Sequence, residues 1–245
     1  MRRLLAALSL AVFLSNTANA DDVTDLRDRV LKAAAKDPKD IEKFKLFTQK
    51  CKGTSRPGPE PVPATVTRTG VYPDKLREEW ELGEGPGRAG LIVCVAGDVG
   101  WRKPKDEPSF DLPVDELNEL RADAYAVWAS TLITLTEPDT KLSAGGTSKV
   151  GADTVLGLKL SRRPYPDLTL YFDEKRLLLR KLSYKARGAG IVQQKDMIFG
   201  GHKDVGGLML PTTLATYAQG KEMCNWTEME FSFPDKIEKK VFERP

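Results

Sequence analysis

The alternation of apolar and polar residues along the C-terminal half of the chain indicates β-strands. In the stretch "LTLYFDEKRLLLRKLSY", Leu168, Leu170 and Phe172 fall on one face of an extended chain. The charged residues 173–176 interrupt this pattern, and residues 177–184 then carry leucines on both faces. Because side chains alternate between the two faces of a strand, the stretch predicts a hairpin with apolar groups on both sides of its sheet.

Further strands are predicted before and after this hairpin. In "LREEWEL", Leu76, Trp80 and Leu82 share one face and charged residues occupy the other, which is typical of a half-buried antiparallel strand. Residues 91–96 of "GLIVCVAG" are apolar on both faces, as in a central strand. Three later runs also place apolar residues on one face. In "TVLGLKL" they are Leu156, Leu158 and Leu160, and in "LPTTLATY" they are Leu210 and Leu214. In "TEMEFSF" they are Met229, Phe231 and Phe233. Together the runs predict about nine to eleven antiparallel strands.

Three segments have helical rather than strand periodicity. Residues 22–35 predict an amphipathic helix, and the proline that opens 38–44 suits the first turn of another. Residues 113–132 predict the only long internal helix. Its apolar stripe consists of Leu117, Leu120, Ala124, Trp128 and Leu132, with Glu116, Glu119, Arg121 and Asp123 largely off the stripe. The polar, glycine-containing residues 137–147 predict a loop.

A sheet with this many strands has to curve. Wide twisted sheets curl or split, because the twist accumulates from strand to strand. A curled sheet needs something in its hollow, and the predicted helix at 113–132 is the obvious candidate. We therefore expect the strands and helices to share one core in a single domain.

The first twenty residues have the features of a secretion signal. Arg2 and Arg3 precede the apolar residues 4–14, and Ala18-Asn19-Ala20 supplies the small residues of a cleavage site. The apolar segment is too short to span a hydrocarbon core of about 30 Å. We predict that residues 1–20 are a signal peptide cleaved after Ala20, and that residues 21–245 form a single exported domain.

The charge balance argues against a nucleic-acid partner. The chain has 38 Lys plus Arg and 35 Asp plus Glu, and removal of Arg2 and Arg3 leaves a net charge of about +1. Both signs are interspersed along the sequence. A nucleic-acid binder would instead carry a basic patch or stripe.

Few residues have the spacing of a catalytic or metal-binding motif. His202 is the only histidine, and no nucleophile motif accompanies it, so we interpret it as a turn residue in "FGGHKDVGG". The "GAG" at 188–190 lacks the third glycine of a dinucleotide site and is interpreted as a turn. Cys51, Cys94 and Cys224 allow one disulfide of undetermined pairing or three buried thiols. We expect no metal and no cofactor.

Neighbouring carboxylates are a further candidate for acid and base chemistry. The pairs at 78–79 and 173–174 are adjacent in sequence. Neighbours along a strand point to opposite faces, and acidic residues in turns are ordinarily solvated. We therefore expect no carboxylate active site and no enzymatic activity.

The order of elements resembles that of LolA-like proteins, the family of outer-membrane lipoprotein carriers and sorting proteins. The local features are "KFKLFTQKCKGT", "VAGDVGW", "LTLYFDEKRLLLRKLSY", "DVGGLMLPTTLATYAQGKE" and "FSFPDKIEKKVFERP". They extend over most of the chain and are patterns of strands and turns. The resemblance implies an α+β fold, mainly antiparallel β, in which a curved incomplete β-barrel is covered on its concave face by helices.

The resemblance also implies a function. It predicts a carrier or binding protein for lipid, lipoprotein acyl chains or another amphiphile, located in the periplasm of a bacterium with two membranes. The candidate residues for the hydrophobic lining of its cavity are Trp101, Trp128, Leu117, Leu120, Leu170 and Phe172. Two alternatives remain open: an envelope sensor or structural domain that binds a protein partner, and an enzyme built on the same fold.

Overall fold

The structure is a computed structural model that describes residues 20–245 except 86 and 189–190. The predicted signal peptide, apart from Ala20, and most of the predicted turn at 188–190 therefore lie outside the described residues. Within the described part of the chain, no helix is both long and apolar enough to cross a membrane.

The described residues form two α-helices, three short 3-10 helices and fifteen strands. The helices are α1 (Ala20–Ala34), η1 (Pro38–Lys45), α2 (Val114–Ser130), η2 (Ile133–Thr136) and η3 (Lys239–Phe242). The strands of the first half are β1 (Leu46–Ser55), β2 (Val62–Val71), β3 (Lys75–Leu82), β4 (Ala89–Ala96), β5 (Val99–Pro104) and β6 (Phe110–Asp111). Those of the second half are β7 (Lys141–Val150), β8 (Asp153–Ser161), β9 (Leu168–Asp173), β10 (Leu179–Gly188), β11 (Ile191–Gly200), β12 (Lys203–Val205), β13 (Leu208–Leu210), β14 (Thr213–Ala218) and β15 (Lys221–Ser232).

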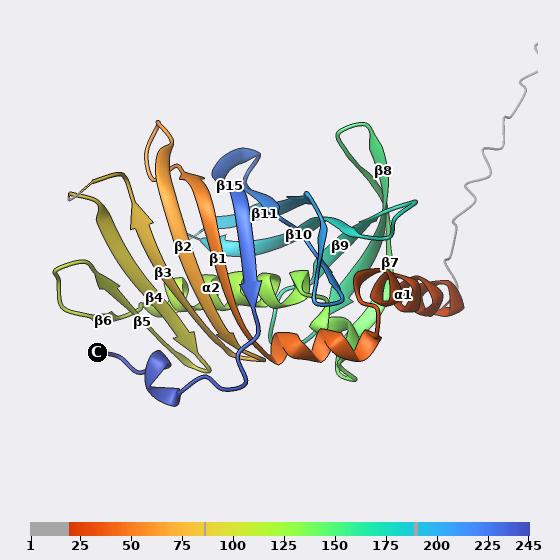
Figure 1. Ribbon diagram of the computed structural model, residues 1–245, viewed down its shortest axis with the longest axis horizontal. Coiled ribbons are helices and arrows are strands. Elements are labelled where there is room, and N and C mark those ends of the chain that lie inside the picture. The colour runs from red at the N-terminus through yellow and green to blue at the C-terminus, as the bar shows by residue number, and fades with distance from the viewer. Residues whose placement is uncertain (1–19, 86, 189–190) are drawn as a thin grey trace, which may run out of the picture.

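Thirteen of these strands form one antiparallel sheet in the order β6-β5-β4-β3-β2-β1-β15-β14-β11-β10-β9-β8-β7. The sheet is a meander in two halves, which join where β1 pairs with β15. It curls around α2, while α1 and η1 lie together at one end (Figure 1). Its two edges, β6 and β7, do not pair with each other, so the barrel is incomplete. The predicted curled sheet with a helix in its hollow is confirmed.

The strand count exceeds the prediction, partly because residues 141–147 are not a loop. They belong to β7, the edge strand beside β8. An edge strand has one partner and a largely solvated face, so it accepts the polar and small residues that suggested a loop. The run "LPTTLATY" is also divided, because Leu210 ends β13 and Leu214 lies in β14.

The hairpin at 168–184 forms as predicted. Leu168, Leu170 and Phe172 of β9 are buried, and Asp173 closes the turn by accepting hydrogen bonds from the backbone N–H groups of Lys175 and Arg176. On the returning strand β10, Leu182 is fully buried. β10 packs against α2, so the inner face of this hairpin meets the helix in the hollow.

Aromatic residues fill the end of the hollow next to η1. The ring of Trp128 on α2 meets Phe47 edge to face at 5.0 Å between centroids and Tyr72 at 5.3 Å. Phe44 of η1 adds a further edge-to-face contact with Phe47 at 6.3 Å. A Cβ at Gly70 would lie 2.5 Å from the Phe47 ring and 2.6 Å from the Trp128 ring, so the packing here depends on glycine.

Candidate ligand cavity

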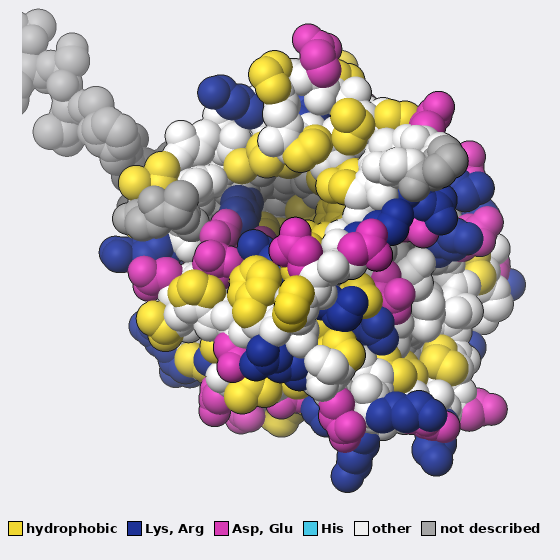
Figure 2. Space-filling view, turned by 90° about the vertical axis from the view of Figure 1, so that its left-hand side faces the viewer, with side chains coloured by type: hydrophobic (Ala, Val, Ile, Leu, Met, Phe, Trp, Pro, Cys, Tyr) yellow, Lys and Arg dark blue, Asp and Glu magenta, His cyan; other side chains and the backbone are white. Residues whose placement is uncertain are grey.

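A cavity of about 300 Å³ lies between α2 and the inner face of the sheet. Its walls come from β2, β3 and β4 on one side and from β10, β11, β14 and β15 on the other, with α2 between them. Figure 2 shows the hollow from the end of the molecule at which α2 begins, with hydrophobic side chains inside it and charged side chains around it. The cavity is therefore open to solvent at this end.

Apolar side chains make up the larger part of the cavity wall. They are Leu76, Trp80, Val93, Val95, Leu120, Ala124, Val127, Met197, Ala218, Met223 and Trp226. Trp80 and Trp226 lie against each other at 5.5 Å between ring centroids. The size and lining are those of a small-molecule site, which is usually apolar with a few polar groups.

One group of polar side chains connects α2 to the sheet across the cavity wall. The Nζ of Lys195 on β11 lies 2.8 Å from Glu119 Oε1 and 2.8 Å from Asp123 Oδ2, both on α2. The Tyr184 hydroxyl on β10 donates to Asp123 Oδ1 at 2.7 Å. Burial raises the pKa of Asp123, against the effect of Lys195. The network fixes the helix above the hollow.

A second polar group lies on β2 and β3. Arg68 Nε donates to Glu78 Oε1 at 2.6 Å, and the two side chains are only 7% and 18% exposed. The Arg68 guanidinium also donates to Gln49 Oε1 at 2.8 Å. The indole N–H of Trp80 donates to Glu78 Oε2 at 3.0 Å. Burial is the largest single influence on Arg68 and opposes its charged form, but the interactions with Glu78, Cys51 and Cys224 together outweigh burial, so the pKa of Arg68 is raised.

The three cysteines are protonated thiols, two of them close to the cavity and Cys94 on the outer face of the sheet. Cys51, Cys94 and Cys224 are all free, so none of the three possible disulfides forms. Burial raises the pKa of Cys51 to about 11 and also raises that of Cys224. Because the thiolate is the nucleophile, these residues are unreactive at neutral pH. Among the described residues, no three His, Cys, Asp or Glu side chains are placed to hold a metal ion.

The six predicted lining residues fall into three places. Leu120 lines the cavity. Trp128, Leu170 and Phe172 are at most 1% exposed and belong to the packed core, and Leu117 packs against that core from α2. Of the three predicted lining residues on α2, Leu120 is therefore a wall residue, Trp128 belongs to the filled end and Leu117 packs against the core.

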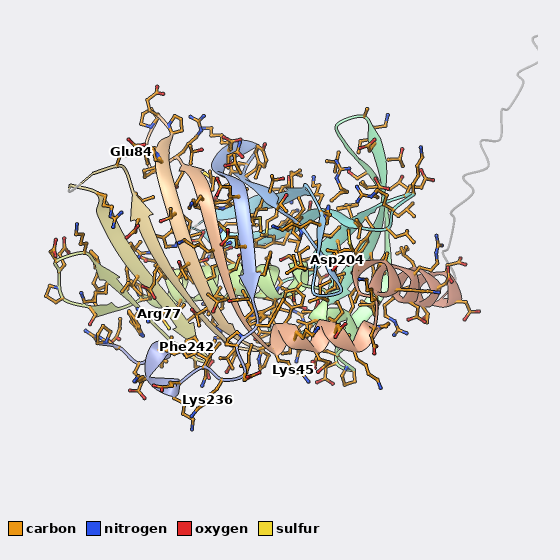
Figure 3. The ribbon with its side chains drawn as sticks, in the orientation of Figure 1. Lys45, Arg77, Glu84, Asp204, Lys236 and Phe242 are labelled. Atoms are coloured by element: carbon orange, nitrogen blue, oxygen red, sulfur yellow. The ribbon has the colours of Figure 1, made fainter. Side chains whose placement is uncertain are left out.

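Trp101 lies on the opposite face of the sheet. Its neighbour Gly100 faces Leu117 on the inner side, whereas the Trp101 indole N–H donates to the backbone carbonyl of Phe242 at 3.1 Å. Phe242 of η3 lies beside Arg77 on the outer face (Figure 3), and Arg77 donates to the Val241 carbonyl at 3.3 Å. Trp101 thus anchors the C-terminal segment and points away from the cavity.

The charged residues of the cavity wall were not among the predicted lining residues. Glu78 shares the face of Leu76 and Trp80, and its position two residues from each was the available signal. Glu119 and Asp123 were placed largely off the helix stripe, but the structure turns them toward Lys195 in the wall. A charged residue on an otherwise apolar face indicates either a buried ion pair or a cavity whose wall contains that residue.

His202 lies beyond the far end of the cavity, beside a smaller space of about 40 Å³. Burial, together with the positive charges of Arg176 and Arg180, lowers its pKa to about 4. It is therefore neutral at pH 7. Its place in the segment between β11 and β12 agrees with the predicted turn.

Comparison with known proteins shows which solved structures share this fold. No protein-family model matches the sequence, and no curated protein matches it significantly. Among solved structures, a LolA superfamily protein from Nitrosomonas europaea matches with a TM-score of 0.55 at 12% identity, over 89% of this chain and 97% of that chain. A protein described as an outer-membrane lipoprotein-sorting domain, from Vibrio parahaemolyticus, matches with a TM-score of 0.55 at 12% identity, over 91% and 97% of the two chains.

A third solved structure extends the comparison. A DUF1329 family protein from Desulfovibrio piger matches with a TM-score of 0.53 at 9% identity, over 90% of this chain and 97% of that chain. At such identities the likeness is one of fold, and it includes nearly the whole length of each relative. The chain therefore has the LolA-like fold that the sequence resemblance implied.

Proposed function

We propose that this chain is a binding or carrier protein that holds a lipid, a lipoprotein acyl chain or another amphiphile between α2 and the sheet. The observation that carries the proposal is the open, mainly apolar cavity of about 300 Å³. This volume lies at the lower end of the range of ligand sites. Each methylene group transferred from water into such a site contributes about 0.8 kcal/mol.

The charges in the wall support binding rather than catalysis. Arg68 is paired with Glu78, and Lys195 is paired with Glu119 and Asp123. A charged ligand group would find these partners already engaged, whereas an apolar chain needs no partner. The signal peptide predicted at residues 1–20 supports action outside the cytoplasm, and we propose the periplasm.

Native mass spectrometry of gently purified protein tests the proposal, together with titration by a fluorescent apolar probe. We expect a co-purified amphiphile or saturable binding of one probe molecule. Trp80 and Trp226 in the wall should report the binding through their fluorescence, because both lie at the cavity. The control is Trp101→Phe, whose side chain lies on the outer face and should leave probe affinity unchanged.

Absence of both lipid and probe binding would refute the proposal. A pull-down from envelope extract that returns a stoichiometric protein and no lipid would favour the sensor or structural domain instead. Turnover of a bound compound would favour an enzyme.

A further inference from the structure

At its inner end the cavity is not closed off by continuously packed core residues. Behind it lies the smaller space of about 40 Å³, lined by apolar residues of η1, β10, β11 and β13. Three side chains, those of Arg68, Val127 and Met197, line both spaces. These three residues therefore form a partition between a front chamber, open to solvent, and a deep chamber.

The depth of the front chamber follows from α2, which runs along it. Glu119 lines the front chamber, Val127 lies in the partition, and Ser130 lines the deep chamber. The eight steps along the helix from Glu119 to Val127 correspond to about 12 Å at 1.5 Å per residue. A fully extended carbon chain advances about 1.25 Å per carbon, given C–C bonds of about 1.5 Å. The chamber is thus about ten carbons deep.

The volume accommodates a chain of this length. The front chamber of about 300 Å³ is well above the roughly 10–15 Å³ that one water molecule requires by the same measure. A ten-carbon chain therefore fits, and the depth of the chamber sets the limit on its length.

The partition combines two fixed side chains and one adaptable side chain. Arg68 is held by Glu78 and Gln49, and it presents a charged group that an apolar chain end would have to desolvate. Val127 is fixed on α2 and has a stiff β-branched side chain. Met197 is unbranched and flexible, and it is 7% exposed. Met197 is therefore the side chain whose size decides whether a chain can pass from the front chamber to the deep chamber.

We propose that the ligand is an amphiphile with about ten carbons in its buried chain, and that Met197 sets this length limit. The polar end stays at the open mouth, and the chain end stops against Met197, Val127 and Arg68. This inference rests on the proposed function, because it assigns the class of ligand to the same cavity.

A series of straight-chain 1-alkanols of about 6 to 14 carbons tests the limit, with affinities measured by displacement of a fluorescent apolar probe. For the unchanged protein we expect the affinity to rise about fourfold per carbon and to level off near ten carbons. Met197→Ala joins the two chambers, so its plateau should move to chains two to four carbons longer, because Ser130 in the deep chamber lies about 4.5 Å further along α2 than Val127. Affinities for the shortest members should change little.

Met223→Ala is the matched control, because Met223 lines the front chamber and not the deep chamber. It should alter affinity similarly for all chain lengths and leave the plateau where it is. Val127→Ala provides a second opening of the partition if Met197→Ala fails to fold. An unmoved plateau in the folded opening variant, or no plateau in the unchanged protein, would overturn the length limit. Failure of every alkanol and of the probe to bind would instead overturn the proposed function.

Discussion

The two ends of the hollow use the same curved sheet and the same helix, but one end is filled and the other is open. At the filled end, the large ring of Trp128 on α2 meets Phe47 and Tyr72. At the open end, one to two turns earlier on α2, Ala124 and Leu120 face a cavity of about 300 Å³. Side-chain size along one helix stripe thus decides whether the hollow is core or binding site.

The same two ends also differ in polarity. The filled end is held by edge-to-face aromatic contacts, whereas the walls of the open end carry two ion-paired groups, around Arg68 and around Lys195. A buried ion pair contributes little net stability compared with well-packed apolar groups. We infer that the filled end stabilises the fold and that the ion pairs hold the open end in shape while leaving space.

The largest difference in stability between the two ends is expected when side chains of α2 are shortened to alanine. Trp128→Ala should lower the free energy of unfolding by about 3–5 kcal/mol, because it leaves a large void in packed surroundings. Leu120→Ala should cost less than about 2 kcal/mol, because the leucine already borders open space. Chemical denaturation of both variants measures the difference. Equal losses would mean that the two ends are packed alike.

Removal of one member of a wall ion pair should cost about 3 kcal/mol. Arg68→Leu leaves the Glu78 carboxylate, which is 18% exposed, without its cation. The matched control is Arg29→Leu, which breaks an ion pair with Asp25 on the surface of α1 and should change stability by at most about 0.5 kcal/mol. If both substitutions have the same small effect, water hydrates the Glu78 carboxylate in the variant and the wall of the open end is not dehydrated.

The filled end should lose stability at acid pH through His202. Its pKa is lowered from 6.5 to about 4 in the folded protein, so between these values the unfolded chain binds more protons than the folded chain. Stability should therefore fall as pH drops from 6.5 toward 4, by about 2 kcal/mol from this residue once solvent screening of its partly exposed ring is allowed for. Chemical denaturation across this range should show a shallower slope for His202→Gln. An unchanged slope would assign the loss to carboxylates.

The smallest difference in stability between the two ends is expected when side chains are enlarged. Gly70→Ala should destabilise by about 1–2 kcal/mol, since its Cβ would lie 2.5 Å from the Phe47 ring and 2.6 Å from the Trp128 ring. Val93→Leu, in the cavity wall, should change stability by less than about 1 kcal/mol, because the extra carbon enters free space. Thermal unfolding of the two variants measures the contrast, and a larger loss for Val93→Leu would contradict it.

Periodicity in the sequence predicted the fold much better than the site. The hairpin at 168–184 and the helix in the hollow follow from local patterns of apolar residues. The cavity depends on which side chains meet across the sheet: Lys195 reaches Asp123 over 72 positions, and such pairs leave no local pattern. Trp101 shows the same limit, since its burial comes from the distant C-terminal segment on the outer face.

Filling the open end while leaving the filled end unchanged is the most direct test of a ligand site in the hollow. Val93→Phe places a ring in the cavity wall at a position of β4 that does not contribute to the aromatic cluster of Trp128. We predict that the unchanged protein binds one apolar probe molecule and that folded Val93→Phe binds it at least about tenfold more weakly. Equal probe affinity for the two proteins, or no binding by either, would contradict the claim that this cavity is a ligand site.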